Sequence, residues 1–201
     1  MYPSIPDEAT VLRGPFVTSF SDDEFFRFCE ENELVRIERT AAHEIIIMPP
    51  AGFESSAASG QVYFELALWQ RQSLSGVVLE SSVGYALPDG AVLSPDASWV
   101  SPERLATVTP AQRQKFPPLC PDFVIEIKSP SDRIPTLQAK MEQWLRNGVQ
   151  LGFLLDTESE TAYVYRPGQP AETLPGFDRE LSGEPVLPGF QLDLRALRPQ
   201  S

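Results

Sequence analysis

Two opposite charges lie two residues apart in an otherwise apolar stretch of the sequence. Glu126 and Lys128 belong to the segment PDFVIEIKSPSD, residues 121–132, whose β-branched and aromatic residues predict an interior strand. Side chains alternate across a strand, so Glu126 and Lys128 share one face of it. Burying a carboxylate and an ammonium group is costly, and we therefore expect a chemical reason for the pair. Such a pair can hold a metal ion and a phosphate group together.

Two other carboxylates occur where they can reach the same site. Asp96 follows Pro95 at the start of a predicted strand over residues 96–101. Glu54 stands at the entrance of a predicted helix over residues 55–74. Two strands and a helix that meet at one point would bring these acids to the charged strand, so we expect a single site.

Carboxylates on neighbouring strands suit a divalent metal. Mg²⁺ takes oxygen ligands and keeps several of its waters. We expect Asp96 and Glu126 to bind Mg²⁺ or Mn²⁺, with the backbone carbonyl of Ile127 as a further ligand. Lys128 would then orient or deprotonate an attacking water, or neutralise charge on a phosphodiester, while the metal lowers the pKa of that water.

The composition is that of an ordinary globular protein with a strongly acidic balance. The chain has 201 residues, 42% of them hydrophobic and 22% charged, which is enough for one domain with its own core. The formal net charge of −12 is an objection to a nucleic-acid partner. The objection is weakened because acids that bind a divalent cation carry their negative charge only until the ion arrives. Seven basic residues also lie between positions 104 and 146, near the charged strand.

The sequence favours a cytoplasmic protein. No apolar run approaches the roughly 20 residues that cross a bilayer, and the first residues lack the basic start and apolar core of a secretory signal. The two cysteines, Cys29 and Cys120, are too far apart for a metal-binding knuckle, and a disulfide framework normally uses more of them.

Helical and extended segments alternate along the chain. Ser21 and Glu24 have the pattern of a capping box, which predicts a helix that ends near Asn32. A later helix is expected over residues 135–147, ended by Gly148. Further strands are expected over residues 34–40, 43–48, 76–81, 83–87, 151–156 and 161–166.

The motif residues resemble those of a known superfamily of nucleases. Pro95-Asp96 and then Glu126-Ile127-Lys128 resemble the bipartite PD-(D/E)XK motif of restriction-endonuclease-like proteins. The segments PDFVIEIKSPSD, LQAKMEQWLRNGVQLGFLLD, AYVYRPG and MPPAGFESS resemble the Uma family within it. The similarity covers residues 18–168. It implies an α/β fold, with a restriction-endonuclease-like core of a central mixed sheet flanked by helices, and metal-dependent cleavage of DNA. Residues 1–17 would be an N-terminal extension, and residues 169–201 a Pro-rich tail with a hairpin, packed on the same domain.

The resemblance also implies roles for individual residues. By position, Asp96 and Glu126 would be metal ligands, Lys128 the catalytic lysine, and Glu54 an accessory acid at the metal site. Lys140 matches a lysine that recurs on the helix after the motif in this family. Some members lack the motif lysine and rely on the helix lysine, whereas this chain has both.

Each of these residues also has a purely structural interpretation. Glu126 and Lys128 can form an ion pair on one face of the strand. Asp96 can be a turn residue, and Glu54 a helix N-terminal acid that the helix dipole favours. Lys140, at the edge of the apolar stripe of its helix, can extend along the surface into solvent.

We therefore expect an endonuclease that hydrolyses DNA phosphodiester bonds with Mg²⁺ or Mn²⁺. Two alternatives stay open. A non-catalytic binding or assembly module on the same fold would agree with the acidic charge, as would a metal-dependent hydrolase of small phosphoesters. No membrane partner is expected. A homodimer is expected if the enzyme cuts both strands, because this usually needs two active sites.

Overall fold

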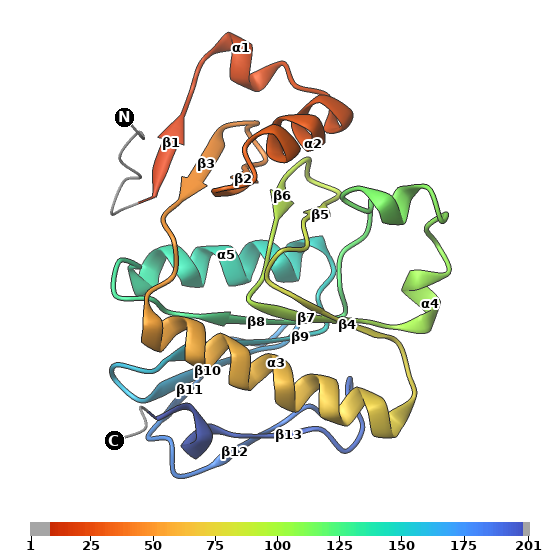
Figure 1. Cartoon of the computed structure of the whole chain (residues 1–201). Helices are drawn as coiled ribbons and strands as arrows, with labels where there is room; N and C mark the ends of the chain where they lie inside the picture. The colour runs from red at the N-terminus through yellow and green to blue at the C-terminus, as the bar shows by residue number, and fades with distance from the viewer. Residues whose placement is uncertain (1–8, 199–201) are drawn as a thin grey trace. The chain divides into compact units, whose positions relative to one another are not determined.

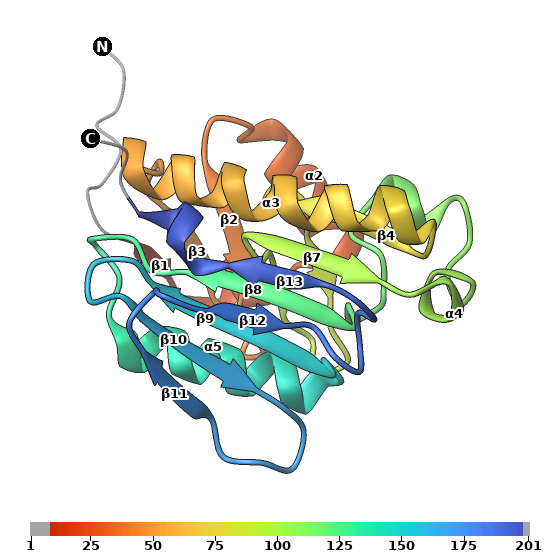
Figure 2. The same ribbon diagram turned by 90° about the horizontal axis from the view of Figure 1, so that it is seen from below.

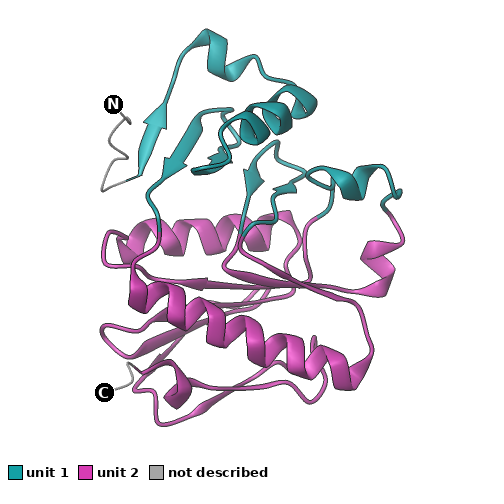
Figure 3. Ribbon diagram, in the orientation of Figure 1, with its two compact units in different colours: residues 1–50, 82–94, 108–119 teal, residues 51–81, 95–107, 120–201 magenta. Residues whose placement is uncertain are grey.

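The chain folds into two compact units. The structure, a computed structural model, describes residues 9–198. Unit 1 comprises Met1–Pro50, Ser82–Ser94 and Val108–Leu119, and unit 2 comprises Ala51–Ser81, Pro95–Thr107 and Cys120–Ser201 (Figure 3). The domain limits expected at residues 18 and 168 stay predictions.

Unit 1 is a small antiparallel sheet that packs against a helix. The sheet has the order β1-β3-β2-β6-β5, with strands β1 (Thr10–Leu12), β2 (Arg36–Arg39), β3 (Ile45–Met48), β5 (Tyr85–Ala86) and β6 (Val92–Leu93). The helical segments are α1 (Pro15–Thr18), α2 (Asp22–Glu31) and the 3-10 turn η1 (Gln112–Gln114). The expected capping box is confirmed, because Ser21 and Glu24 bond each other's backbone N–H groups at the start of α2. Phe25 of α2 packs into a core with Ile37, Ile45 and Val92.

Unit 2 is built on a six-stranded mixed sheet. Its order is β11-β10-β9-β8-β7-β4, with strands β4 (Val77–Glu80), β7 (Ala97–Val100), β8 (Phe123–Ile127), β9 (Leu151–Asp156), β10 (Thr161–Tyr165) and β11 (Glu172–Pro175). Strands β8 and β9 are parallel, and every other neighbouring pair is antiparallel. A parallel pair needs a crossover connection, and α5 (Ile134–Asn147) supplies it.

One face of this sheet is covered by α3 (Phe53–Ser73) and by the end of the chain. The end of the chain contributes a hairpin of β12 (Glu180–Ser182) and β13 (Gln191–Asp193), followed by the 3-10 turn η2 (Leu194–Leu197). The short helix α4 (Pro102–Leu105) follows β7. A single buried cluster joins α3, the sheet and the tail, and it includes Val62, Leu66, Phe123, Ile125 and Leu192. The tail is therefore part of the core of unit 2.

The other face of the sheet is covered by α5. Figure 1 shows the sheet nearly edge-on, with α5 on one side and α3, β12 and β13 on the other, and Figure 2 shows the same layers from below. Met141 and Trp144 are the fully buried residues of α5. Gly152 on β9 lies directly under Met141, so any Cβ at this position would collide with the methionine methyl group. The helix ends at Gly148, which has the left-handed backbone conformation (φ 117°) that favours glycine.

The expected α/β architecture with a central mixed sheet flanked by helices is confirmed. The helix expected over residues 55–74 begins two residues earlier, at Phe53. The short strands β1 and β6 were not expected from the sequence. Within residues 9–198, no helix combines the length and the apolar character needed to cross a membrane.

Because the tail shares the core of unit 2, truncating a tail side chain should destabilise the whole unit. Leu192 is fully buried, and we expect Leu192→Ala to lower the free energy of unfolding by about 2–5 kcal/mol. The control, Leu74→Ala, makes the same change at a side chain that is 85% exposed and should shift it by no more than about 0.5 kcal/mol. Urea unfolding followed by circular dichroism measures both. Equal effects would show that the tail does not belong to this core.

Candidate active site

Asp96 and Glu126 belong to neighbouring segments of the sheet. Strand β7 pairs with β8 so that Ala97 faces Ile125, and Asp96 is the residue immediately before β7. The N–H of Asp96 donates to the carbonyl of Ile125 at 3.0 Å, and its Oδ2 accepts the N–H of Ile127 at 2.7 Å. The sheet itself therefore fixes the position of this carboxylate.

Glu126 belongs to the sheet face that α5 covers. Ala97 and Ile125 point into the cluster beneath α3. Because side chains alternate along a strand, Glu126, the residue after Ile125, belongs to the opposite face. The carboxylate of Asp96 is brought next to it by its bond to the N–H of Ile127. The sequence-predicted pair of acids is therefore brought together at one place in the sheet.

Glu126 is buried and is held by two side chains of α5. The side chain of Trp144 donates its indole N–H to Oε1 of Glu126 at 2.8 Å. The ammonium group of Lys140 lies 2.9 Å from the same oxygen. A buried carboxylate is tolerated when it is paired and hydrogen-bonded. These two contacts explain how Glu126, only 3% exposed, is accommodated in the middle of the sheet.

Lys128 pairs with acids that follow the next strand. Its Nζ lies 2.8 Å from Oε2 of Glu158 and 4.0 Å from Oδ1 of Asp156. The hydrogen bond to Glu158 raises the pKa of Lys128 above its ordinary value, and the charge of Asp156 acts in the same direction. The structure thus brings Lys140 to Glu126, whereas the ion pair of Lys128 is with Glu158.

Glu54 lies in the first turn of α3 and is exposed. It precedes Ala58 by one helical turn, in the row of α3 side chains that meets the sheet from the other face. Within the part of the chain that the structure describes, no three His, Cys, Asp or Glu side chains form a group suited to a metal ion. Glu54 therefore does not join Asp96 and Glu126 in such a group, and its role as an accessory acid stays a prediction.

Asp96 and Glu126 suit a divalent cation that keeps much of its own hydration. Mg²⁺ is usually bound by one or two carboxylates together with waters and substrate phosphates. Both carboxylates also accept bonds from the protein, Asp96 from Ile127 and Glu126 from Trp144 and Lys140. A carboxylate has two oxygens and about four lone pairs, so it can accept such bonds and bind a metal at once. The donor set fits this mode of binding.

Trp144 is a site residue that the sequence reasoning missed. Hydropathy alone places Trp144 on the apolar side of its helix, and its fully buried ring fits that placement. A buried tryptophan N–H usually needs an acceptor, however, and Trp144 follows Lys140 by four residues on the same helix face. A buried carboxylate on a strand, such as Glu126, is the kind of acceptor that this N–H needs.

The two cysteines are unsuited to nucleophilic chemistry. Burial raises the pKa of the Cys120 thiol to about 12 and that of the Cys29 thiol to about 11. Both therefore remain protonated at neutral pH, and a thiol reacts as a nucleophile only in its thiolate form.

Comparisons with known proteins agree with this fold. The chain matches the family Uma2, described as "Putative restriction endonuclease", over residues 22–195. It also resembles the crystal structure of a putative nuclease belonging to DUF820 from Anabaena variabilis ATCC 29413, with a TM-score of 0.73 and 21% identity over 89% of this chain and 97% of that one. Curated proteins gave no match. The structural likeness shows a shared fold, and the family match supports a nuclease-like function.

The hydrogen bond from Trp144 to Glu126 predicts a measurable cost for its removal. Trp144→Phe keeps an aromatic ring but deletes the donor to a charged, buried acceptor, which should lower the free energy of unfolding by about 1.5–3 kcal/mol. Trp69→Phe is the control, since Trp69 donates to the neutral carbonyl of Pro188 and the expected loss is about 0.5–1.5 kcal/mol. Unfolding of the wild type and both variants in guanidinium chloride measures the two losses of free energy. A loss no larger at Trp144 than at Trp69 would mean that Glu126 does not depend on the indole.

Proposed function

The chain belongs to the Uma2 family, and on this premise we propose that it is a divalent-metal-dependent nuclease that hydrolyses phosphodiester bonds of DNA. One observation carries the proposal. The carboxylate of Asp96 accepts the N–H of Ile127, the residue after Glu126, and the ammonium group of Lys140 lies 2.9 Å from Glu126. Two carboxylates beside a lysine offer both a metal-binding group and a positive charge for a phosphate.

Asp96 and Glu126 would hold Mg²⁺ or Mn²⁺, with the carbonyl of Ile127 as a further oxygen ligand. When bound, the metal would lower the pKa of an attacking water and stabilise negative charge on the phosphate. Asp96 is positioned for this role by the Ile127 N–H, and Glu126 by Trp144. Glu54 is the proposed accessory acid, contributing charge from the first turn of α3.

Lys140 is the lysine that we propose to act on the reacting groups. Its ammonium group already lies at a proposed metal ligand, so a phosphate bound beside Glu126 would be within its reach. There it can orient the attacking water and neutralise the charge that develops on the phosphate oxygens. Lys128 stays the second candidate, because its side chain would first have to leave Glu158 and Asp156. A long, flexible lysine side chain can make such a move, and Glu158 is 80% exposed.

The acidic balance of the chain bears on the substrate. A net charge of −12 opposes tight, non-specific binding of DNA, which depends on many phosphate contacts. A nuclease with this charge should need the metal to bind its substrate as well as to cleave it, because the cation reduces the repulsion at the site. DNA binding should therefore be weak without a divalent metal.

Removal of either proposed ligand should abolish cleavage. Asp96→Asn and Glu126→Gln each delete an anionic oxygen ligand with little change in volume, and we expect a fall in kcat of at least about 100-fold. Glu172→Gln makes the same change at an exposed acid on β11 and should retain activity. The measurement is plasmid cleavage with Mg²⁺ or Mn²⁺, with a calorimetric titration of each metal on the same variants. Turnover close to wild type in both site variants would refute the assignment.

The wild-type result separates the alternatives. Metal binding without cleavage of plasmid or of a small phosphodiester would indicate a non-catalytic module. Cleavage of the small ester alone would indicate a hydrolase of small phosphoesters. Either result would replace the proposal of a DNA nuclease.

The two lysines can be separated by kinetics. Lys140→Met should lower kcat by at least about 100-fold, whereas Lys128→Met should lower it by less than about 10-fold, because the ammonium group of Lys128 is held by Glu158 and Asp156. Both changes remove the charge and keep an unbranched side chain, so each is a control for the other. Single-turnover and steady-state rates at saturating metal give the two constants. The reverse pattern would assign the catalytic role to Lys128.

A further inference from the structure

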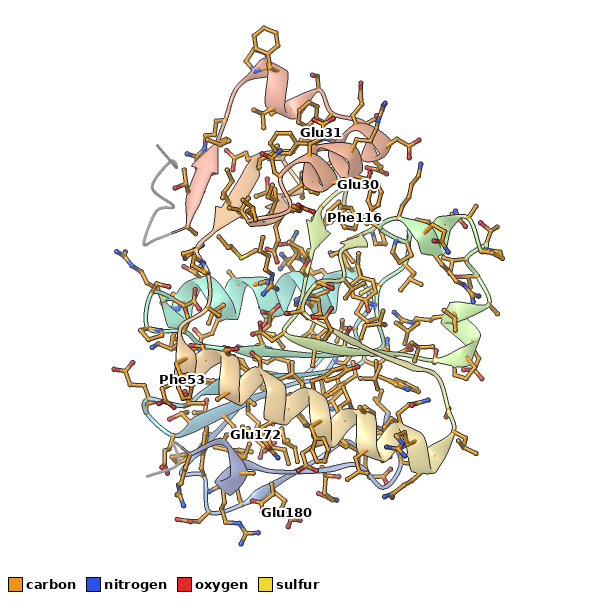
Figure 4. All side chains as sticks on the ribbon, viewed as in Figure 1. Glu30, Glu31, Phe53, Phe116, Glu172 and Glu180 are labelled. Atoms are coloured by element: carbon orange, nitrogen blue, oxygen red, sulfur yellow. The ribbon has the colours of Figure 1, made fainter. Side chains whose placement is uncertain are left out.

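The outer face of α3 carries exposed apolar side chains. Ala58, Val62 and Leu66 of this helix are buried against the sheet. At 100° per residue, the side directly opposite them carries a continuous row that is in contact with solvent. We call this row the α3 stripe, and it consists of Phe53, Ala57, Gly60, Phe64 and Leu68. Phe53 is 85% exposed, Phe64 57% and Leu68 38%, and Phe53 is labelled at the beginning of the helix in Figure 4.

Gly60, in the middle of the α3 stripe, has no explanation within the described part of the chain. Glycine inside a helix costs about 0.5–1 kcal/mol relative to alanine. A Cβ at Gly60 would meet no atom within 4 Å outside the local helix backbone, so packing within residues 9–198 does not require its absence. Glycine is favoured where another backbone or a bulky side chain must approach closely. The stripe therefore combines projecting phenylalanines with a central notch.

We propose that the α3 stripe binds the same stripe of a second copy of this chain, with the two helices antiparallel about a two-fold axis. In such an isologous contact both subunits use the same surface. If one residue contacts a second residue of the partner, the second residue of the first subunit contacts the first residue of the partner. An axis beside position 62 places Phe64 opposite the partner subunit's Gly60, and Gly60 opposite the partner subunit's Phe64. The same axis places Ala57 opposite the partner subunit's Ala67. Projections and notches are thus matched by a single symmetry operation.

The charges at the ends of the helix fit the same arrangement. Glu54 is in the first turn of α3 and Arg71 is in the last turn, and both are exposed. The axis beside position 62 brings Arg71 to the partner subunit's Phe53 and Glu54, where an ion pair and a cation–π contact can form. Antiparallel helix dipoles also attract. A parallel pair would instead place Arg71 against Arg71 and Phe64 against Phe64.

The chemistry of the α3 stripe argues against nucleic acid as its occupant. Arg71 is the one basic side chain of α3, and the stripe itself is uncharged. Phosphate binding needs several positive charges. A contact made by one helix is also small, and interfaces of this size are typical of weak complexes. We therefore expect a dimer with a Kd on the order of 10 µM.

The test is the oligomeric state of the full chain. Sedimentation velocity from about 1 to 300 µM, a range that brackets the expected Kd, should show reversible dimerisation of the wild type. Phe64→Glu should leave a monomer throughout this range, and Arg71→Glu should weaken the dimer at least about 10-fold. Leu34→Glu makes the same apolar-to-acid change at a residue that is 84% exposed elsewhere and should dimerise as wild type does. Circular dichroism checks that each variant is folded.

Gly60→Ala gives an independent readout. In a monomer the change should raise the melting temperature, because alanine is the better helix former. At the proposed interface it should at the same time raise the Kd of the dimer, because the notch for Phe64 is filled. A wild type that stays monomeric up to 300 µM would overturn the proposal, as would a dimer that neither Phe64→Glu nor Gly60→Ala affects.

Cross-linking tests the orientation. Protein carrying Ala57→Cys mixed with protein carrying Ala67→Cys should form a disulfide-linked heterodimer under mild oxidation, and wild type, with Cys29 and the buried Cys120, gives the background. Efficient cross-linking of Ala57→Cys protein with itself would show a parallel arrangement and would contradict the proposed antiparallel arrangement about an axis beside position 62.

Discussion

The buried carboxylate of Glu126 is the constraint on which the arrangement of unit 2 depends. A charge in the middle of a six-stranded sheet is stable only with partners that are held in place. The partners cannot come from β8 itself, whose next side chain on that face, Lys128, turns to Glu158. They come from α5, which offers Lys140 and Trp144 one turn apart. Helix α5, which connects the parallel strands β8 and β9, thus also supplies the positive charge that pairs with Glu126.

The opposite face of the sheet shows why this constraint can be met. Alternate residues of β8, Phe123 and Ile125, enter a core with α3 and with the tail, which contributes Leu192 and Leu194. That large apolar contact fixes the strand in position independently of its charged residues. The apolar layer stabilises the unit and leaves the α5 face able to carry polar groups, whose net contribution to stability is small or unfavourable. One face of β8 therefore stabilises the unit, and the other face carries the charged group of the candidate site.

The sequence predicted those features of unit 2 that depend on local patterns. The apolar run around Glu126 predicted β8, and the stop signal at Gly148 predicted the end of α5, whose expected start lies one residue after the observed one. Alternation along β8 placed Glu126 on the face opposite Ile125. Local patterns do not predict which of the two lysines pairs with Glu126. Lys128 and Lys140 have side chains long enough to reach several acids, and the partner depends on which strand and helix are neighbours in space. Trp144 was missed for a related reason, because hydropathy reports the burial of its ring and not the hydrogen bond of its N–H.

A lysine supplied by a helix differs physically from one supplied by the strand of the metal ligands. A strand lysine two residues after the carboxylate lies about 7 Å along the strand, so it must bend back to reach the same group. A lysine on a helix packed over the strand approaches the carboxylate from above, and its distance depends on how closely the helix packs. Here Met141 of α5 packs on Gly152 of β9, where an added Cβ would collide with the methionine Cε. A larger residue at position 152 would therefore require the Met141 side chain to move. Glycine at this position thus suits the close packing of the helix whose Lys140 lies 2.9 Å from Glu126.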